Sequence, residues 1–163
     1  MDRIILGDCL KVMDTFDDEL FDAVILDPPY HKAFSSTIIE IARKSERILK
    51  PKGSFVSIIP NYAIPTIVPA ISSFLKYRWT FCMWQKEGAH PRMAMGVEIL
   101  WKPIMWWVKG SWKKGRGFVP DGFENTPPKK EYHVWEQSMT WAEFCVSKFT
   151  REGENILDPL CGS

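Results

Sequence analysis

The chain has 163 residues, of which 45% are hydrophobic and 25% charged, and its formal net charge is +1. This length fits one ordinary domain and is too short for two, and no apolar run reaches membrane-spanning length. A charge so close to zero neither requires nor excludes a nucleic-acid partner. The start of the chain lacks a secretory hydrophobic region, and the four cysteines are far apart with no CxxC pair. We therefore expect reduced thiols, no metal site and a cytoplasmic location.

The first half of the chain predicts strands that alternate with helices. We expect a short strand over residues 3–6, closed by Gly7-Asp8, and then a helix over residues 9–16. The apolar run at residues 21–26 is typical of a strand buried on both faces. A helix pattern follows, with Ile38, Ile41 and Ile48 on one stripe, and Pro51-Lys52-Gly53 is expected to end it.

The second half continues this alternation. Strands are expected over residues 54–59, 78–84, 97–108 and 155–157, and helices over residues 65–75 and 141–149. Between them, residues 110–131 hold four glycines, paired prolines and a basic cluster, which predicts a loop or an inserted arm. The alternation of strands and helices favours βαβ units and an open parallel sheet within a single domain over residues 1–163.

The segment Asp27-Pro28-Pro29-Tyr30 follows a predicted buried strand, and open α/β sheets bind ligands at the carboxyl ends of their strands. Neither proline has a backbone N–H, so the segment offers carbonyl oxygens and a carboxylate as rigidly held acceptors. Such acceptors suit a substrate with two N–H donors, namely an exocyclic amino group. Tyr30 adds a flat face on which a heteroaromatic ring can stack. The alternative interpretation is a rigid turn, because Asp-Pro and Pro-Pro pairs are common in loops.

A second motif lies at residues 155–163, where a short predicted strand runs into a turn of small residues. Small residues allow a cofactor to approach the backbone closely, as glycines do in nucleotide-binding turns. The Cys-Gly-Ser end is weak evidence alone, and it becomes strong evidence together with the first motif.

The two motifs make the chain resemble the N6-adenine/N4-cytosine DNA methyltransferases, specifically their circularly permuted beta class. In that family a catalytic D-P-P-Y motif precedes a cofactor motif that typically reads L-D-P-F-x-G-S-G. Here residues 27–30 match the first motif and residues 157–163 the second, with Leu160 in place of phenylalanine and Cys161 at the free position. The Gly7-Asp8 element also matches the family, and the resemblance covers nearly the whole chain.

The resemblance implies a Rossmann-like α/β sheet of a methyltransferase that depends on S-adenosyl-L-methionine, circularly permuted, with the chain stopping inside the cofactor motif. It implies methyl transfer to the N6 amine of an adenine flipped out of double-stranded DNA, by a bacterial, archaeal or phage enzyme. The implied catalytic residues are Asp27, Pro28, Pro29 and Tyr30. The implied cofactor-binding residues are Asp8, Asp158, Pro159, Cys161 and Gly162.

Three departures from the family pattern leave alternatives open. The family's H-P-x-x-K-P-like segment has Val134, Gln137 and Ser138 in place of its prolines and lysine, and residues 110–131 are short for a target-recognition insertion. The helix and the acidic strand end expected after the cofactor motif are not in the chain. The alternatives are a cytosine-N4 or RNA methyltransferase, or an inactive remnant that binds nucleic acid or a partner. A homodimer or a completing chain also stays open.

Basic side chains in two predicted loops are candidates for contact with DNA phosphates, although solvated surface loops are the competing interpretation. They are Lys86, Arg92, Lys113, Lys114 and Arg116. The sequence also contains eight tryptophans. We expect Trp106, Trp107 and Trp112 to be sheet and core residues rather than a stacking platform.

Overall fold

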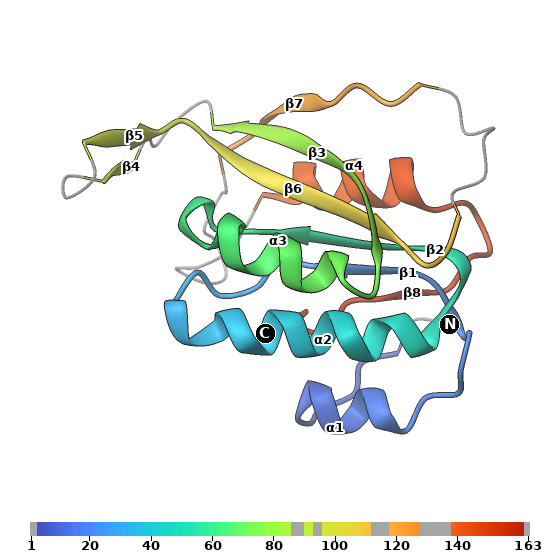
Figure 1. The fold of residues 1–163 in the computed structure, drawn as a ribbon. Helices are drawn as coiled ribbons and strands as arrows, with labels where there is room; N and C mark the ends of the chain where they lie inside the picture. Colours follow the sequence, from blue (N-terminus) through green and yellow to red (C-terminus); the bar gives the residue numbers. More distant parts are fainter. Residues whose placement is uncertain (1–2, 86–89, 93–95, 112–117, 128–137, 162–163) are drawn as a thin grey trace.

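The computed structural model describes residues 3–85, 90–92, 96–111, 118–127 and 138–161. Their strands form a six-stranded sheet in the order β7-β3-β6-β2-β1-β8, and β4 and β5 form a separate two-stranded ribbon (Figure 1). The strands are β1 (Phe21–Leu26), β2 (Leu49–Ile58), β3 (Lys76–Gln85), β4 (His90–Arg92), β5 (Val97–Ile99), β6 (Trp101–Val108), β7 (Gly122–Asn125) and β8 (Ile156–Leu157). The helices are α1 (Cys9–Asp14), α2 (Ser35–Ile48), α3 (Ile64–Ser72) and α4 (Met139–Phe149), with short 3-10 turns η1 (Lys32–Phe34) and η2 (Asn61–Ala63).

The sheet is mixed rather than fully parallel. β1 pairs in parallel with both β2 and β8, as expected, whereas β6 lies antiparallel between β2 and β3. The prediction of an open parallel sheet was therefore wrong for β6. Its cause is the ribbon β4-β5, which connects β3 to β6 as a hairpin and so reverses the direction of the chain. Hydrophobic periodicity carries no information on strand direction, so the sequence alone could not reveal this reversal.

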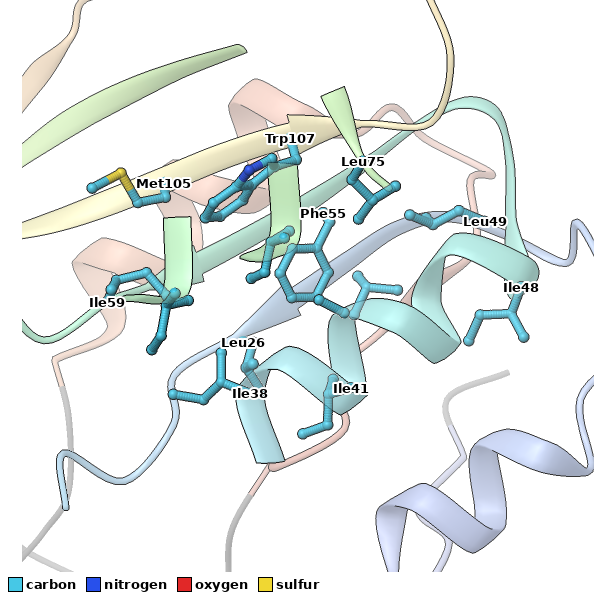
Figure 2. Packing of buried hydrophobic residues seen from close by; sticks show 14 of the residues in the cluster. Leu26, Ile38, Ile41, Ile48, Leu49, Phe55, Ile59, Leu75, Met105 and Trp107 are labelled. Carbon is cyan, nitrogen blue, oxygen red and sulfur yellow. The ribbon is translucent and has the colours of Figure 1, made fainter. Parts of the chain in front are cut away.

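Helices α2 and α3 cover one face of the sheet (Figure 1), and the apolar stripe of α2 packs against it (Figure 2). Ile38 and Ile41 of α2 meet Leu26 of β1 and Phe55 of β2 in one cluster, which Trp107 of β6 completes. All five side chains are at most 1% exposed, so the amphipathic pattern of residues 35–48 does predict the buried face of α2.

Helix α4 covers the opposite face, above β6 and β3 (Figure 1). Phe144 and Phe149 of α4 pack edge-to-face on Phe81 of β3, with ring centroids 5.8 and 5.4 Å apart. Trp106 of β6 is 8% exposed in the same cluster, so the expected core positions of Trp106 and Trp107 are confirmed. Trp112 lies outside the described residues.

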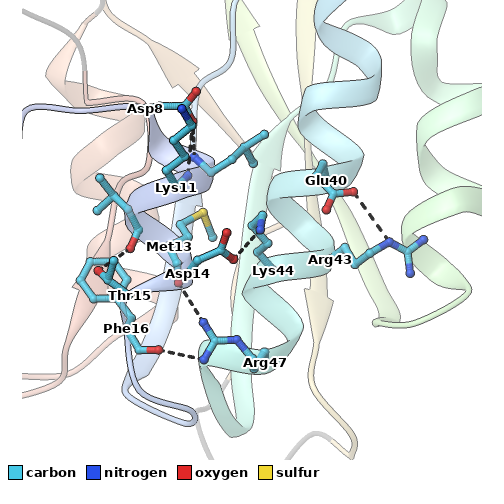
Figure 3. Close-up of polar contacts among 12 residues, drawn as sticks. Asp8, Lys11, Met13, Asp14, Thr15, Phe16, Glu40, Arg43, Lys44 and Arg47 are labelled. Carbon is cyan, nitrogen blue, oxygen red and sulfur yellow. Dashed lines mark hydrogen bonds and ion pairs between the residues drawn. The ribbon is translucent and has the colours of Figure 1, made fainter.

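Helix α1 is attached to α2 both by apolar packing, in which Met13 is buried, and by polar contacts (Figure 3). Arg47 at the end of α2 donates to the carbonyl oxygens of Met13 and Phe16 at 2.9 and 2.8 Å, and it also pairs with Asp18. Lys44 pairs with Asp14. The two hydrogen bonds from Arg47 satisfy carbonyl oxygens at and just after the end of α1, where the helix itself offers no partner.

Two local predictions were wrong. Residues 3–6 form no strand: they pair with none of the six strands of the sheet, and Ile4 and Leu6 are fully or almost fully exposed. The expected turn at Pro51-Lys52-Gly53 lies inside β2 instead. It shifts the register with β1, in which Phe21 pairs with Leu49 but Ala23 pairs with Ser54. Within this irregular stretch Lys52 has a φ of 71°, in the left-handed region.

The region 110–131 was expected to be a loop or an inserted arm, and its described part contains β7, which pairs in parallel with β3 at the edge of the sheet. The ribbon β4-β5 projects away from the sheet beyond β3 and β6 (Figure 1). Within the described residues, no helix is long and apolar enough to cross a membrane.

Candidate active site

The candidate site lies at the carboxyl ends of the neighbouring parallel strands β1 and β8. The two strands are parallel and pair Ala23 with Ile156 and Val24 with Leu157. Asp27 follows β1 by one residue and Asp158 follows β8 by one residue. The carboxyl ends of adjacent parallel strands therefore bring together two motifs that lie 131 positions apart in the sequence, by the difference of 158 and 27.

A chain of two hydrogen bonds organises the site. The Tyr30 hydroxyl donates to Oδ1 of Asp27 at 2.7 Å, and Nζ of Lys102 donates to the Tyr30 hydroxyl oxygen at 3.2 Å. The same ammonium group lies 4.6 Å from the centroid of the Tyr30 ring, within the range of a cation–π contact. Lys102 is the second residue of β6, which runs antiparallel to β2 and so begins at the end of the sheet where the parallel strands β1 and β2 finish.

Burial dominates the electrostatics of these three groups. It raises the pKa of Asp27 above its ordinary value, and the hydrogen bond from Tyr30 and the charge of Lys102 oppose part of that rise. Burial, together with the neighbouring Asp27, raises the pKa of Tyr30 well above its ordinary value, so the phenol stays protonated and donates. Burial lowers the pKa of Lys102, and the negative charge of Asp27 opposes part of this decrease.

Asp158 and Cys145 lie within electrostatic range of Asp27. The Asp158 residue is exposed, yet the surrounding protein removes enough hydration to raise its pKa, and the charge of Asp27 adds to the rise. Its Oδ1 accepts from the backbone N–H of Leu160 at 2.9 Å, which closes the turn that follows β8. Burial, with a contribution from Asp27, raises the pKa of Cys145 of α4 to about 12, so its thiol is protonated and not a nucleophile.

The backbone of the segment Asp27–Tyr30 is held by a residue that follows a neighbouring strand. Tyr62 lies in η2, shortly after β2, and its hydroxyl donates to the carbonyl oxygen of Tyr30 at 3.0 Å. That carbonyl is therefore occupied, although the sequence predicted the whole motif as acceptors. Pro28 is buried, whereas Pro29 is exposed. His31, to which the sequence gave no role, accepts from the N–H of Ala33 and begins η1.

Asp8 has a local structural role that the sequence did not predict. Its Oδ1 accepts from the backbone N–H groups of Leu10 and Lys11, at 2.9 and 3.3 Å, and so caps α1 (Figure 3). It also lines an open hollow of about 500 Å³ together with Arg3, Gly7 and other residues up to Phe16. Asp8 does not follow a strand, because residues 3–6 form none.

We expect Asp8→Ala to lower the free energy of unfolding by about 1 kcal/mol, the usual effect of removing an N-cap side chain. Urea denaturation measures this. Asp8→Ser keeps a capping oxygen and is the matched control, expected to retain most of the stability. Equal stability of Asp8→Ala and the unchanged protein would contradict the capping role.

The structure describes only some of the remaining predicted site residues. Cys161 is exposed and Pro159 half-buried in the turn after β8. The backbone of Arg92 lies in β4, opposite Val97 of β5. The other candidates lie outside the described residues, and so does the segment at residues 133–137. These candidates are Gly162, Lys86, Lys113, Lys114 and Arg116.

Sequence reasoning missed Lys102 and Tyr62. Lys102 did leave a signal, since it is the only charged residue of the apolar strand β6 (WKPIMWWV), and a lysine in such a strand needs a partner. Its partner could not be found without the direction of that strand. Tyr62 left no signal, because a tyrosine after a strand is unremarkable in a chain with so many aromatic residues.

The raised pKa of Asp27 predicts how this side chain affects stability. A folded-state pKa above the unfolded one means that the folded protein binds the proton more tightly. The contribution of Asp27 to the free energy of unfolding therefore falls as the pH rises from the ordinary aspartate value to the raised one. We expect Asp27→Asn, which carries no charge, to be more stable than the unchanged protein at neutral pH. The difference should vanish below the ordinary aspartate pKa of about 3.9.

Chemical denaturation of the two proteins at both pH values measures this difference. Asp17→Asn is the control, because Asp17 is exposed and its substitution should leave stability unchanged at both. Lower stability of Asp27→Asn at neutral pH would contradict the prediction.

No protein-family model and no curated protein matches the chain, whereas solved structures match it at low sequence identity. M1.HpyAVI, solved as a complex with SAM, is 18% identical with a TM-score of 0.75, and the match covers 99% of this chain and 83% of that one. The cytosine-N4-specific PvuII DNA methyltransferase is 15% identical with a TM-score of 0.77, over 94% of this chain and 72% of that one.

A third structure is TTHA0409 from Thermus thermophilus, assigned as a DNA modification methylase and complexed with S-adenosyl-L-methionine. It is 17% identical with a TM-score of 0.72, over 96% of this chain and 78% of that one. These likenesses show that the chain has the mixed α/β fold of S-adenosylmethionine-dependent methyltransferase structures, as the sequence resemblance implied.

Proposed function

We propose that the protein is a DNA amino-methyltransferase of the circularly permuted D-P-P-Y type, which methylates the N6 amine of adenine with S-adenosyl-L-methionine. The observation that carries the proposal is the position of Asp27. Its largely buried carboxylate follows the parallel strand β1 and lies within electrostatic range of Asp158 of the second motif, within a fold shared with methyltransferase structures.

Asp27 is suited to activate an exocyclic amine. The lone pair of such an amine is conjugated with the ring, so the nitrogen is a weak nucleophile. A hydrogen bond from each of its two protons, one to Asp27 and one to a proline carbonyl, favours the pyramidal form with a localised lone pair. The carboxylate also stabilises the positive charge that grows on the nitrogen, and burial strengthens this effect because it excludes water.

The hydrogen bond from Tyr30 leaves the Asp27 carboxylate with lone pairs that can accept from the substrate amine. Oδ1 accepts from Tyr30, and the carboxylate has a second oxygen and further lone pairs to accept an amine proton. When the nitrogen gains a methyl group it must lose a proton, and Asp27 is the base placed to take it. The ring of Tyr30 gives a planar surface beside this carboxylate, suited to a base that has been rotated out of the duplex.

The residues after β8 fit the cofactor. S-adenosylmethionine supplies the electrophilic methyl group on a positively charged sulfur. Asp158 provides a carboxylate beside Asp27, and the exposed turn through Pro159 and Cys161 provides accessible backbone. Asp8 is the proposed contact for the adenosine portion of the cofactor, at the hollow described above.

Methyl transfer to DNA tests the proposal. The protein is incubated with tritium-labelled S-adenosylmethionine and unmethylated DNA, and the nucleosides of the product are separated. We expect label in N6-methyladenine. Label in no nucleoside, with DNA from several sources and at several salt concentrations, would overturn the proposal.

Cytosine-N4 methylation is the second candidate, favoured by the likeness to the cytosine-N4-specific PvuII enzyme. The chemistry is the same, because cytosine also presents an exocyclic amine with two protons. The same nucleoside separation decides between them, since label in N4-methylcytosine would replace the adenine assignment and leave the role of Asp27 unchanged.

A further inference from the structure

Lys102 is a half-buried cation that the amine-activation chemistry described above does not use. It is the one charged side chain of β6, which is otherwise apolar, and its ammonium lies against the hydroxyl and the ring of Tyr30. Taking a lysine out of water is costly unless a partner of opposite charge compensates. The partial burial of Lys102 is therefore unfavourable by itself, and its interactions with Tyr30 and Asp27 compensate for the lost hydration.

The titratable groups of the site come from four elements. They are Asp27 and Tyr30 after β1, Asp158 after β8, Cys145 of α4 and Lys102 itself on β6. Cys145 and Tyr30 are neutral, so the charges are two carboxylates and one ammonium. Asp27 is the carboxylate that interacts with Lys102, directly through its charge and indirectly through the Tyr30 hydroxyl.

Without a nearby cation, the surroundings of Asp27 would favour its protonated, neutral form. Burial disfavours a charged Asp27, and a protonated carboxyl would be a poorer acceptor and could take no proton from an amine. The ammonium of Lys102 opposes this effect. Because it donates to the Tyr30 oxygen, it also orients the phenol so that its single proton points to Asp27.

We propose that Lys102, acting through Tyr30, is the positioning residue that keeps the Asp27 carboxylate charged and oriented for the substrate amine. This role rests on the proposed amino-methyl transfer. Lys102 itself touches neither the amine nor the methyl group in this scheme. What the role requires is a permanent positive charge and an N–H donor at this position, and arginine supplies both.

The first experiment measures Asp27 without any reaction. The side-chain carboxyl of aspartate is labelled with ¹³C in the full chain, and Asp27 is assigned from the signal missing in Asp27→Asn. We expect Lys102→Met to raise the titration midpoint of Asp27 by about one pH unit or more, as loss of a close opposite charge does. Lys102→Arg should keep the midpoint near that of the unchanged protein. Lys76→Met, an exposed lysine at the far end of β3, should not move it.

The second experiment follows methyl transfer to DNA as a function of pH. Lys102→Met should shift the acidic limb of kcat/KM to higher pH by the same amount, which is about a tenfold loss per unit on that limb. Lys102→Arg should restore the limb. A variant that merely misfolds would lose activity at every pH, and far-ultraviolet circular dichroism with a thermal melt identifies it.

The outcomes separate the two proposals. An unchanged Asp27 midpoint in Lys102→Met would overturn the role of Lys102, and so would a shift that Lys102→Arg fails to reverse. A midpoint that moves as expected in a protein that methylates no DNA would support the coupling of Lys102 to Asp27 and refute the proposed function. Activity with an unmoved acidic limb would support the function and refute the positioning role.

Discussion

Replacing Asp27 with alanine is expected to lower methyl transfer to DNA by at least about 10²-fold, the usual effect of removing one electrostatic group that stabilises a transition state. In the proposed mechanism the largely buried carboxylate accepts an amine proton, and alanine also leaves the Tyr30 hydroxyl without its acceptor. Tritium incorporation into DNA measures the loss. Binding of S-adenosylmethionine, followed by calorimetry, should change far less than the rate.

Two variants make this test specific. Asp27→Asn keeps the shape and one acceptor oxygen but has no charge, and we expect it to lose most of the activity while the protein stays folded. Asp17→Ala removes an exposed carboxylate from the turn after α1 and should leave the rate unchanged. Equal incorporation by Asp27→Ala and the unchanged protein would remove Asp27 from the mechanism and, with it, the basis of the proposed function.

Replacing Trp107 with alanine is expected to lower the free energy of unfolding by about 3–5 kcal/mol. The side chain is fully buried between the sheet and the α2 and α3 layer (Figure 2), where its ring lies 5.9 Å from that of Phe55. Its Nε1 also donates to the Ser72 hydroxyl at the end of α3, at 3.0 Å. Alanine would leave a large cavity between rigid elements that can close it only in part.

Urea denaturation measures this loss, and Trp79→Ala is the matched control. Trp79 lies on the neighbouring strand β3 and is 52% exposed, so the same substitution should cost less than about 1 kcal/mol there. Similar losses for the two variants would mean that Trp107 contributes no more than a surface tryptophan, contrary to its position in the core.

Most elements of the fold could be predicted because their patterns are local. Residues 21–26 were predicted as a buried strand and form β1 with the same bounds, since a continuous apolar run fits a strand covered on both faces. The stripe of Ile38, Ile41 and Ile48 gave the buried face of α2 for the same reason. Residues 3–6 had an equally suitable composition and formed no strand, because a strand also needs a neighbour to pair with.

In the candidate site too, local sequence patterns predicted some features, and only the tertiary structure decided the others. By itself the sequence determined Asp27-Pro28-Pro29-Tyr30 at a strand end, because a buried strand followed by prolines must stop there, and it determined a second strand end at Asp158. Only the tertiary structure decided that β1 and β8 are neighbours and that β6 runs antiparallel. Strand order and direction depend on how separate apolar surfaces pack together, which no local pattern encodes. That packing brings Lys102 to Tyr30, and so it decides the charge environment in which Asp27 acts.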